Sequence, residues 1–239
     1  MEPYIVSDTV HFYENSIFLP QEQTLVISDT HLGYEQQLRA MGHNIEYGQE
    51  VRMLKLLKEI IKESGATKLV INGDVKHEFG RISGQEWRDI MHLLEELKKQ
   101  VEIVIVKGNH DTMTHVLAEK SGVPFVDTHT VGAVHILHGH ELPEEEAACY
   151  IIGHVHPAIT LHDGIRKETY KCFLDGKYKK SQLLVLPSFS TITHGSDILS
   201  TDTISPMITT YGNFDVFVQE DEIRAFGKVK KLATILDMI

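Results

Sequence analysis

Five short motifs of this chain carry the side chain types that bind divalent metals in proteins. They are Ser28-Asp29-Thr30-His31, Gly73-Asp74-Val75-Lys76-His77, Gly108-Asn109-His110-Asp111, His138-Gly139-His140 and Gly153-His154-Val155-His156. Each motif follows a short apolar segment with the pattern of a buried strand. Residues two apart in an extended segment project to the same side, so Asp29 and His31 can reach one ion. Gly73 allows a sharp turn that frees Asp74 to face the same crevice. The motifs therefore predict one shared metal site.

The donor set narrows the choice of metal. Three oxygen donors and four imidazoles are available, namely Asp29, Asp74, Asn109, His31, His138, His154 and His156. This mixture of oxygen and nitrogen suits Mn²⁺, Fe²⁺ or Zn²⁺ and disfavours Ca²⁺. A single Asp-x-His pair or a lone histidine carries little weight, because most such residues lie on the surface or in a satisfied core. Support for a metal site comes from the occurrence of five such motifs in order, each after an apolar strand.

The pattern between the motifs predicts an α/β fold with two packed sheets and helices outside. The first half alternates strands and helices, with strands at 4–7, 10–13, 16–18, 25–28, 68–72 and 101–106. Helices are expected at 50–63, with Val51, Leu54, Leu57 and Ile61 on the buried face, from Ser83 onward, and at 112–121. Strands dominate the second half, at 131–137, 150–152, 158–161, 171–174, 183–186, 215–219 and 222–226. Ligands then belong at the carboxyl ends of the strands.

The composition indicates a globular protein, and we expect a single domain over residues 1–239. Of its residues 42% are apolar, and the formal net charge is −11. That charge argues against wholesale non-specific binding of nucleic acid. Basic residues nevertheless gather in one segment, at Arg166, Lys167, Lys171, Lys177, Lys179 and Lys180. This segment is either a solvated hairpin or a phosphate contact beside the active site.

Location is expected to be cytoplasmic, with no membrane contact. The N-terminal residues lack a secretion signal, and no apolar run approaches a membrane-spanning length. The only cysteines, Cys149 and Cys172, have no zinc-type spacing. A disulfide framework is not expected in a chain of this size.

The motif order resembles the calcineurin-like metallophosphoesterase superfamily, whose pattern is D-x-H, G-D-x-x-(D/H), G-N-H-(D/E), H and G-H-x-H. The match runs from Asp29 to His156 with every ligand position filled. His77, which closes the second motif, is similar to the SbcD-type branch of DNA-repair nucleases. The segments 74–80, 153–157 and 186–190 resemble the small SbcD-related, ICC-like phosphoesterases of archaea.

The resemblance implies a four-layer sandwich of two mixed β-sheets flanked by helices, and a dinuclear site. One metal would take Asp29, His31, Asp74 and His156, and the other Asp74, Asn109, His138 and His154. Manganese is the first expectation, with iron, zinc or nickel as alternatives. A metal-activated water would attack phosphorus, with His110 as general acid. His77 would orient His110 or touch a phosphate oxygen.

Three functions remain open on the sequence. The first is a phosphodiesterase or nuclease acting on DNA, RNA or nucleotides, and the second a phosphomonoesterase or nucleotide pyrophosphatase with the same metal core. A non-catalytic protein-binding scaffold is disfavoured because no ligand is lost. The resemblance also implies a DNA-repair helicase or ligase partner and a homodimer. Substrate choice is expected to lie in the loops 33–47 and 163–181.

Several neighbours of the motifs have open roles. Asp111 and His140 are expected to be structural. Lys76 and Arg81 are either solvated or contact a substrate phosphate, and His194 is a candidate for the pocket lining.

Overall fold

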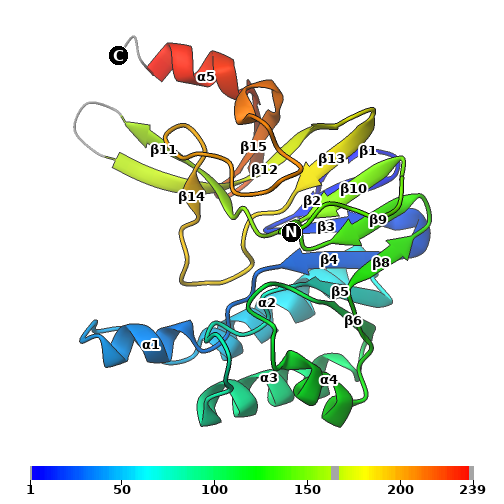
Figure 1. Ribbon diagram of the computed structural model, residues 1–239, viewed down its shortest axis with the longest axis vertical. Helices are drawn as coiled ribbons and strands as arrows, with labels where there is room; N and C mark the ends of the chain where they lie inside the picture. Colours follow the sequence, from blue (N-terminus) through cyan, green and yellow to red (C-terminus); the bar gives the residue numbers. More distant parts are fainter. Residues whose placement is uncertain (1, 163–166, 237–239) are drawn as a thin grey trace.

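The computed structural model describes residues 2–162 and 167–236, and its strands in these ranges form two mixed sheets (Figure 1). The first sheet contains, in spatial order, β1 (Tyr4–Ser7), β2 (Val10–Tyr13), β3 (Ser16–Leu19), β4 (Thr24–Ser28), β5 (Lys68–Asn72), β6 (Glu102–Val106) and β7 (Phe125–Val126). Strands β1 to β4 pair antiparallel, and β4 to β7 pair parallel.

The second sheet is built from the later strands. Its order is β14 (Ser196–Asp197), β11 (Pro157–His162), β12 (Lys167–Tyr178), β13 (Ser181–Val185), β10 (Cys149–Ile152), β9 (Val134–Leu137) and β8 (Thr128–Val131). Two further strands, β15 (Asp215–Gln219) and β16 (Ile223–Lys228), extend from β12. Strands β9, β10 and β13 run parallel.

The helices lie on one side of the first sheet, except that the first extends beyond the sheets and the last lies at the opposite end of the molecule (Figure 1). They are α1 (Tyr34–Ala40), α2 (Gln49–Ser64), α3 (Gly84–Leu97), α4 (Thr114–Ser121) and α5 (Val229–Leu236), with 3₁₀ turns at Pro20–Glu22 and Tyr211–Asn213. Helices α2, α3 and α4 bury their apolar faces against the first sheet. Ser83 caps α3 in a reciprocal pair with Glu86, which confirms the predicted start of that helix.

Besides the layer between the helices and the first sheet, two more apolar layers hold the sheets in place. Between the sheets, Phe12 of β2 stacks on Phe173 of β12 with ring centroids 4.1 Å apart. The outer face of the second sheet is covered mainly by the irregular chain 198–214 and the first turn of α5. The expected α/β sandwich of two mixed sheets is therefore confirmed, although its fourth layer contains little helix.

Some sequence expectations about elements were wrong. Val51 lies 63% exposed, because the buried stripe of α2 runs through Leu57 and Val51 projects about 120° around the helix from it. The segment 131–137 is the end of β8 and the whole of β9, joined by a turn at Gly132. The expected loop 33–47 contains helix α1, which was not predicted because its sequence lacks a helical repeat of apolar residues. Residues 163–166 of the other expected specificity loop lie outside the described residues. No described helix is both long enough and apolar enough to cross a membrane.

Strand register brings the motifs to one edge of the sandwich. Ser28 of β4, Asn72 of β5 and Val106 of β6 lie side by side, so the residues that follow them emerge at one level. In the second sheet Ile152 of β10 is level with Val185 of β13. The Asn72 side chain donates to the carbonyl of Leu137 at 3.0 Å, which ties β5 to β9 across the two sheets. The carboxyl ends of six parallel strands therefore meet in one place.

Candidate metal centre

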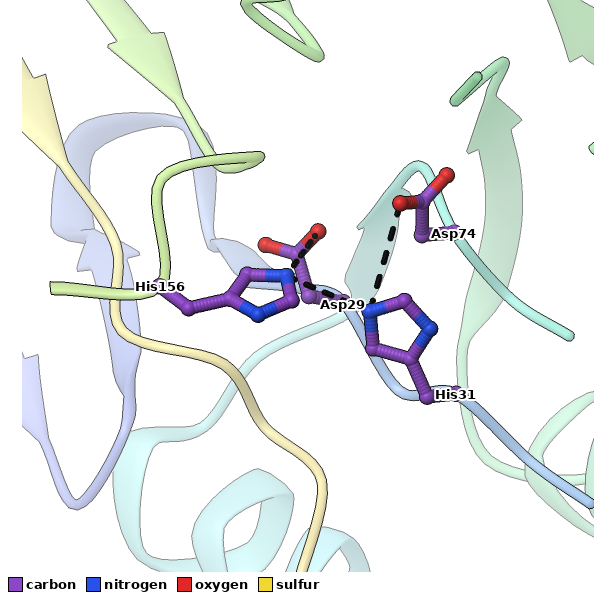
Figure 2. A group of neighbouring side chains, drawn as sticks. All are labelled: Asp29, His31, Asp74 and His156. Atoms are coloured by element: carbon purple, nitrogen blue, oxygen red, sulfur yellow. Dashed lines mark hydrogen bonds and ion pairs between the residues drawn. The ribbon is translucent and has the colours of Figure 1, made fainter. Parts of the chain in front are cut away.

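The structure brings the seven predicted ligands together, although they come from both sheets. The ligand atoms of Asp29, His31, Asp74 and His156 lie within 4.8 Å of one another (Figure 2). Those of Asp74, His138 and His154 form a second such group. The Oδ1 atom of Asn109 lies 3.1 Å from His138 Nε2, so Asn109 belongs with the second group. Asp74 is common to both groups, as a bridging carboxylate would be.

Backbone conformation at these ligands is unusual. Five of them have positive φ, namely Asp29 (56°), His31 (44°), Asp74 (49°), His154 (64°) and His156 (49°). Only three other described non-glycine residues share this region. The left-handed region disfavours residues with a Cβ, and its use concentrates at functional sites. Asp29 and His31 therefore converge, as the sequence predicted. They do so through a tight turn with left-handed backbone, however, and the extended segment expected there was wrong.

Glycines let these turns approach one another. Gly73 has φ of 79°, which confirms the sharp turn expected before Asp74. Gly153 is required for a different reason, namely the close approach of its backbone to β4. A Cβ there would lie 1.7 Å from Ser28 Oγ and 2.5 Å from Asp29 Oδ2. This close approach allows the backbone N–H of His154 to donate to Asp29 Oδ2 at 3.0 Å.

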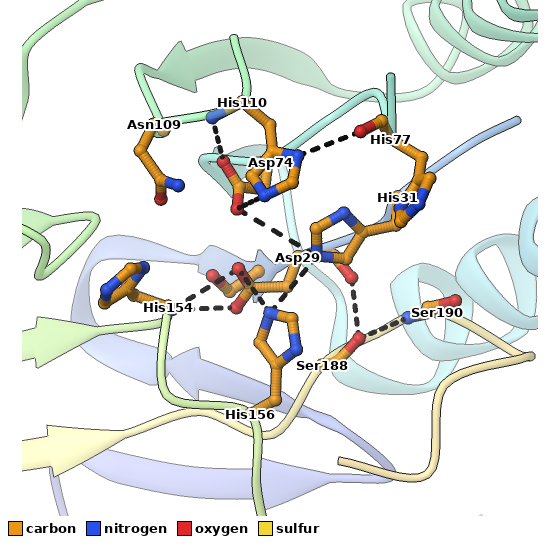
Figure 3. A network of polar contacts seen from close by, with 12 residues as sticks. Asp29, His31, Asp74, His77, Asn109, His110, His154, His156, Ser188 and Ser190 are labelled. Carbon is orange, nitrogen blue, oxygen red and sulfur yellow. Dashed lines mark hydrogen bonds and ion pairs between the residues drawn. The ribbon is translucent and has the colours of Figure 1, made fainter. Parts of the chain in front are cut away.

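The segment after β13 holds the first turn from behind (Figure 3). Ser188 Oγ donates to the carbonyl of Asp29 at 2.7 Å, and Ser190 N–H donates to the same oxygen at 3.3 Å. The ammonium group of Lys171 donates to the carbonyls of Ser188 and Ser190. Burial lowers the pKa of Lys171 to about 8. Sequence reasoning singled out 186–190 only through resemblance, and it missed this supporting role.

Gln49, the first residue of α2, completes the support. Its buried side chain donates to the carbonyls of Thr30 and His31 at 2.9 and 3.2 Å and to Ser190 Oγ at 3.1 Å. The helix is thereby anchored to the turn that presents Asp29 and His31. No pattern in the sequence marks a glutamine for this role.

The two carboxylates are buried and surrounded by imidazoles. Asp29 is 0% exposed and Asp74 2% exposed, and within the described chain their ion-pair partners are histidines alone. Burial opposes ionisation of Asp29, but His156 at 3.0 Å, together with His138 and His31, lowers its pKa below the usual range. The pKa of Asp74 is also lowered, because His138 outweighs the effect of burial. Both side chains are therefore anionic ligands at neutral pH.

The histidines divide into two electrostatic types. Burial and His156 lower the pKa of His31 to about 3, and burial and His138 lower that of His154 to about 4. These two are neutral at pH 7, which is the form that binds metals. Burial also opposes the charge on His138, yet Asp74 and Asp29 raise its pKa to about 9. His138 Nδ1 donates to the carbonyl of Asn72 at 3.0 Å, which directs Nε2 into the cluster.

This donor set fits two divalent cations. The Nε2 atoms of His31 and His156 face each other at 3.2 Å, beside two buried carboxylates. A bound cation between such atoms would be coordinated by both imidazoles and would compensate the carboxylates. The arrangement does not choose among manganese, iron, zinc and nickel.

His110 lies at the edge of the cluster and outside both groups (Figure 3). Its backbone N–H donates to Asp74 Oδ1 at 2.9 Å, and its Nδ1 donates to the carbonyl of His77 at 2.9 Å. The other ring nitrogen, Nε2, lies 3.8 Å from Asp74 Oδ2. Nδ1 therefore carries the hydrogen, and Nε2 faces the metal cluster.

The hydrogen bond between His77 and His110 is made by the backbone of His77, and the two rings lie beside each other with centroids 6.0 Å apart. The His77 ring nitrogen Nε2 lies 2.6 Å from Gln37 Oε1, and the ring packs on Tyr34 with centroids 4.1 Å apart. Burial and His110 lower the pKa of His77. The His77 carbonyl accepts the hydrogen bond from His110, α1 holds the His77 side chain, and an orienting role for His77 stays a prediction.

The structure also places the residues whose roles the sequence left open. Asp111 is buried and bonds to Gly108 N, Val75 N and Thr114 Oγ1, as a structural residue would. Lys76 is fully buried with its ammonium on the carbonyl of Glu78, so neither open role for it was right.

The remaining open residues lie around the cluster. His140 packs beside His138, with ring centroids 5.3 Å apart. Arg81 is exposed and pairs with Glu78 at 3.5 Å. His194 is exposed as well.

The basic segment does not form one surface beside the cluster. Lys171 points inward, whereas Lys177, Lys179 and Lys180 surround the turn from β12 into β13. That turn lies at the start of β13, and the metal cluster lies beyond its other end at Val185. These three exposed lysines therefore form the solvated hairpin that was one of the two alternatives, and they lie away from the cluster. Arg166 lies outside the described residues.

The model of the calcineurin-like phosphoesterase family matches residues 23–219, which is most of the chain and all five motifs. The chain belongs to this family. Together with the buried clusters of histidine and aspartate, membership makes it a metal-dependent phosphoesterase and a hydrolase. No curated protein matches the sequence.

One solved structure agrees with this fold. The nuclease MPE of Pseudomonas putida is 17% identical with a TM-score of 0.68, covering 94% of this chain and 99% of that one. The Yfce phosphoesterase of E. coli is 18% identical with a TM-score of 0.42, covering 86% of this chain and 97% of that one. The first likeness supports the fold, and the second is too weak to support an argument.

Proposed function

We propose that this phosphoesterase is a phosphodiesterase that uses two divalent metals, manganese first, and acts on nucleic acid or nucleotides. The observation that carries the proposal is the position of His110. Its ring is fixed by a hydrogen bond to the His77 carbonyl, it belongs to neither group of metal ligands, and its Nε2 atom faces the cluster. The leaving oxygen of an ester of an ordinary alcohol, such as a sugar hydroxyl of a nucleotide, departs as an alkoxide unless a proton is supplied, so a separate acid beside the metals suits cleavage of such esters.

The chain's own residues have distinct tasks in this scheme. Asp29, His31, Asp74 and His156 would hold one metal, and Asp74, Asn109, His138 and His154 the other. When bound, such a pair neutralises phosphoryl charge and activates water. His110 holds a proton on Nε2 for the leaving oxygen while its Nδ1–H stays on the His77 carbonyl. General acid catalysis of this kind contributes roughly 10²–10⁴-fold.

The similar fold of a protein described as a nuclease supports nucleic acid as the substrate class. The net charge of −11 favours short substrates over long nucleic acid strands, because binding of many phosphates needs an extensive positive surface. A phosphomonoesterase with the same metals is the alternative outcome of the test.

Turnover tests the proposal. The value of kcat/KM is measured in the presence of manganese for three substrates: bis-p-nitrophenyl phosphate, p-nitrophenyl phosphate and a short single-stranded DNA. We expect the diesters to be cleaved at least about tenfold more efficiently than the monoester. Asp74→Asn should lose activity on both, because asparagine tolerates the left-handed backbone but removes the shared charge. Preference for the monoester would favour the alternative, and activity unaffected by Asp74→Asn would refute the site.

A further inference from the structure

Phe79 presents an exposed aromatic ring against the candidate acid. Its ring centroid lies 3.6 Å from that of His110, with the planes inclined by 36°. Phe79 is nevertheless 57% exposed, two residues beyond His77 in the loop that follows β5. One part of the ring therefore packs on His110, and the rest is open to solvent at the edge of the metal cluster.

We propose that Phe79 is a stacking platform for the nucleobase of the leaving nucleoside, and hence a specificity-determining residue. The inference rests on the proposed function, because it takes His110 as the group that protonates the leaving oxygen. The leaving oxygen and its base belong to the same nucleoside. A nucleoside whose oxygen meets His110 Nε2 has its base within a sugar's length of the ring that packs on His110. Aromatic platforms of this kind bind any base through its π-face.

The side of the cluster at His138 has a different character from the side at Phe79. A cavity of about 560 Å³ beside His138 and His140 is lined by Asp127, Glu141, Glu144 and Glu145. Phosphates of a longer strand would meet like charge there. The acidic wall therefore disfavours that direction for a nucleic acid, and the aromatic side near Phe79 remains for the departing nucleoside.

A purely structural role for Phe79 makes a different prediction. If the ring only covers His110, its replacement should change the turnover of every substrate by the same factor, whether or not the substrate carries a base. Base dependence is thus the measurement that separates the two roles. Phe226, an exposed aromatic of β16, provides a matched control for loss of an exposed ring.

The experiment measures binding and turnover separately. Binding uses thymidine dinucleotides in which a methylene group replaces one bridging oxygen, so that this bond cannot be cleaved. Each bridging oxygen is replaced in turn, and each analogue is made with and without the base on that side. Calorimetry with manganese-loaded protein gives the Kd values. Turnover uses the natural dinucleotide.

For wild type we expect loss of the leaving-side base to weaken binding roughly tenfold, within the 5–150-fold that stacking of one base supports. Phe79→Leu should abolish this base dependence, Phe79→Trp should keep it, and Phe226→Leu should not change it. Equal base dependence in wild type and Phe79→Leu, or none in wild type, would overturn the inference. Absence of dinucleotide turnover in wild type would instead refute the proposed function, and the binding result would still decide the role of Phe79.

Discussion

Individual residues of the centre are held in position before any ligand arrives. Asp29, His31 and Asp74 occupy left-handed backbone conformations, and each turn is held by hydrogen bonds from neighbouring segments. Such conformations cost of order 1–3 kcal/mol each and persist only where the surroundings impose them. With His154 and His156, five ligands share this conformation, and their backbone strain lowers the stability of the chain in exchange for a fixed ligand geometry.

His110 allows a prediction at this scale. His110→Asn should keep the bond to the His77 carbonyl through an amide N–H at the position of Nδ1 and lacks the proton on Nε2, so we expect kcat for a nucleotide diester to fall roughly 10²–10⁴-fold. Because His110 lies outside both ligand groups, the metal content should stay at the wild-type value. Kinetics and metal analysis of the same preparation check this. A loss of metal would mean that His110 is itself a ligand.

Single residues also show where sequence reasoning stops. The seven candidate ligands could be named because metal donors are rare directly after apolar strands. The burial of Lys76 could not, because its ammonium is satisfied by the carbonyl of Glu78, a contact created by the loop itself. The contact from His77 to His110 is equally hidden, since any residue at position 77 has a carbonyl.

Elements were predictable where periodicity was strong. Strand β5 was expected at its observed bounds, and α3 was expected from its capping serine. Helix α1 was missed because tertiary contacts hold it. Glu35 accepts from Gln49 N–H and from Gln85 Nε2, and Tyr34 packs on His77. Its sequence offers no apolar stripe, so only the assembled site explains it.

The meeting of strand ends gives a second prediction. Gly153→Ala should force β10 away from Ser28 and Asp29, since the added Cβ would lie 1.7 Å from Ser28 Oγ. We expect metal affinity to fall roughly 10–100-fold, as for lost support of a ligand, with a stability loss of about 1–3 kcal/mol. Metal titration and denaturant unfolding measure the two effects.

Gly84→Ala is the matched control for that substitution, because outside the helix backbone the nearest atom to its Cβ is the end of the flexible Arg88 side chain at 3.5 Å. It should leave metal affinity unchanged. If both variants behaved alike, the close approach of β10 to β4 would not matter for the centre.

At the scale of the whole molecule, metal should stabilise the fold. Ligands come from both sheets, so a bound metal favours the folded state over a chain in which they are dispersed. Saturation at about a thousand times Kd contributes about 4 kcal/mol, which corresponds to a Tm increase on the order of 10 °C for a chain of this size.

Thermal unfolding with manganese and with a chelator tests this expectation. Wild type should show the difference in Tm, and Asp74→Asn should lose most of it because both groups share Asp74. An identical Tm with and without metal in wild type would contradict metal binding at this centre. The expected homodimer and the helicase or ligase partner stay predictions from resemblance.

The Asn72–Leu137 contact and the ligand groups both join the two sheets, and this has a consequence for the order of folding. Asp29 and His156 are 127 positions apart in the chain, as their numbers show, yet must meet at one ion. Contacts of such separation form late, after local strands and helices. Capture of metal is therefore a late event that reports docking of one sheet on the other. A refolding chain followed by its metal signal would reveal when the two halves become one molecule.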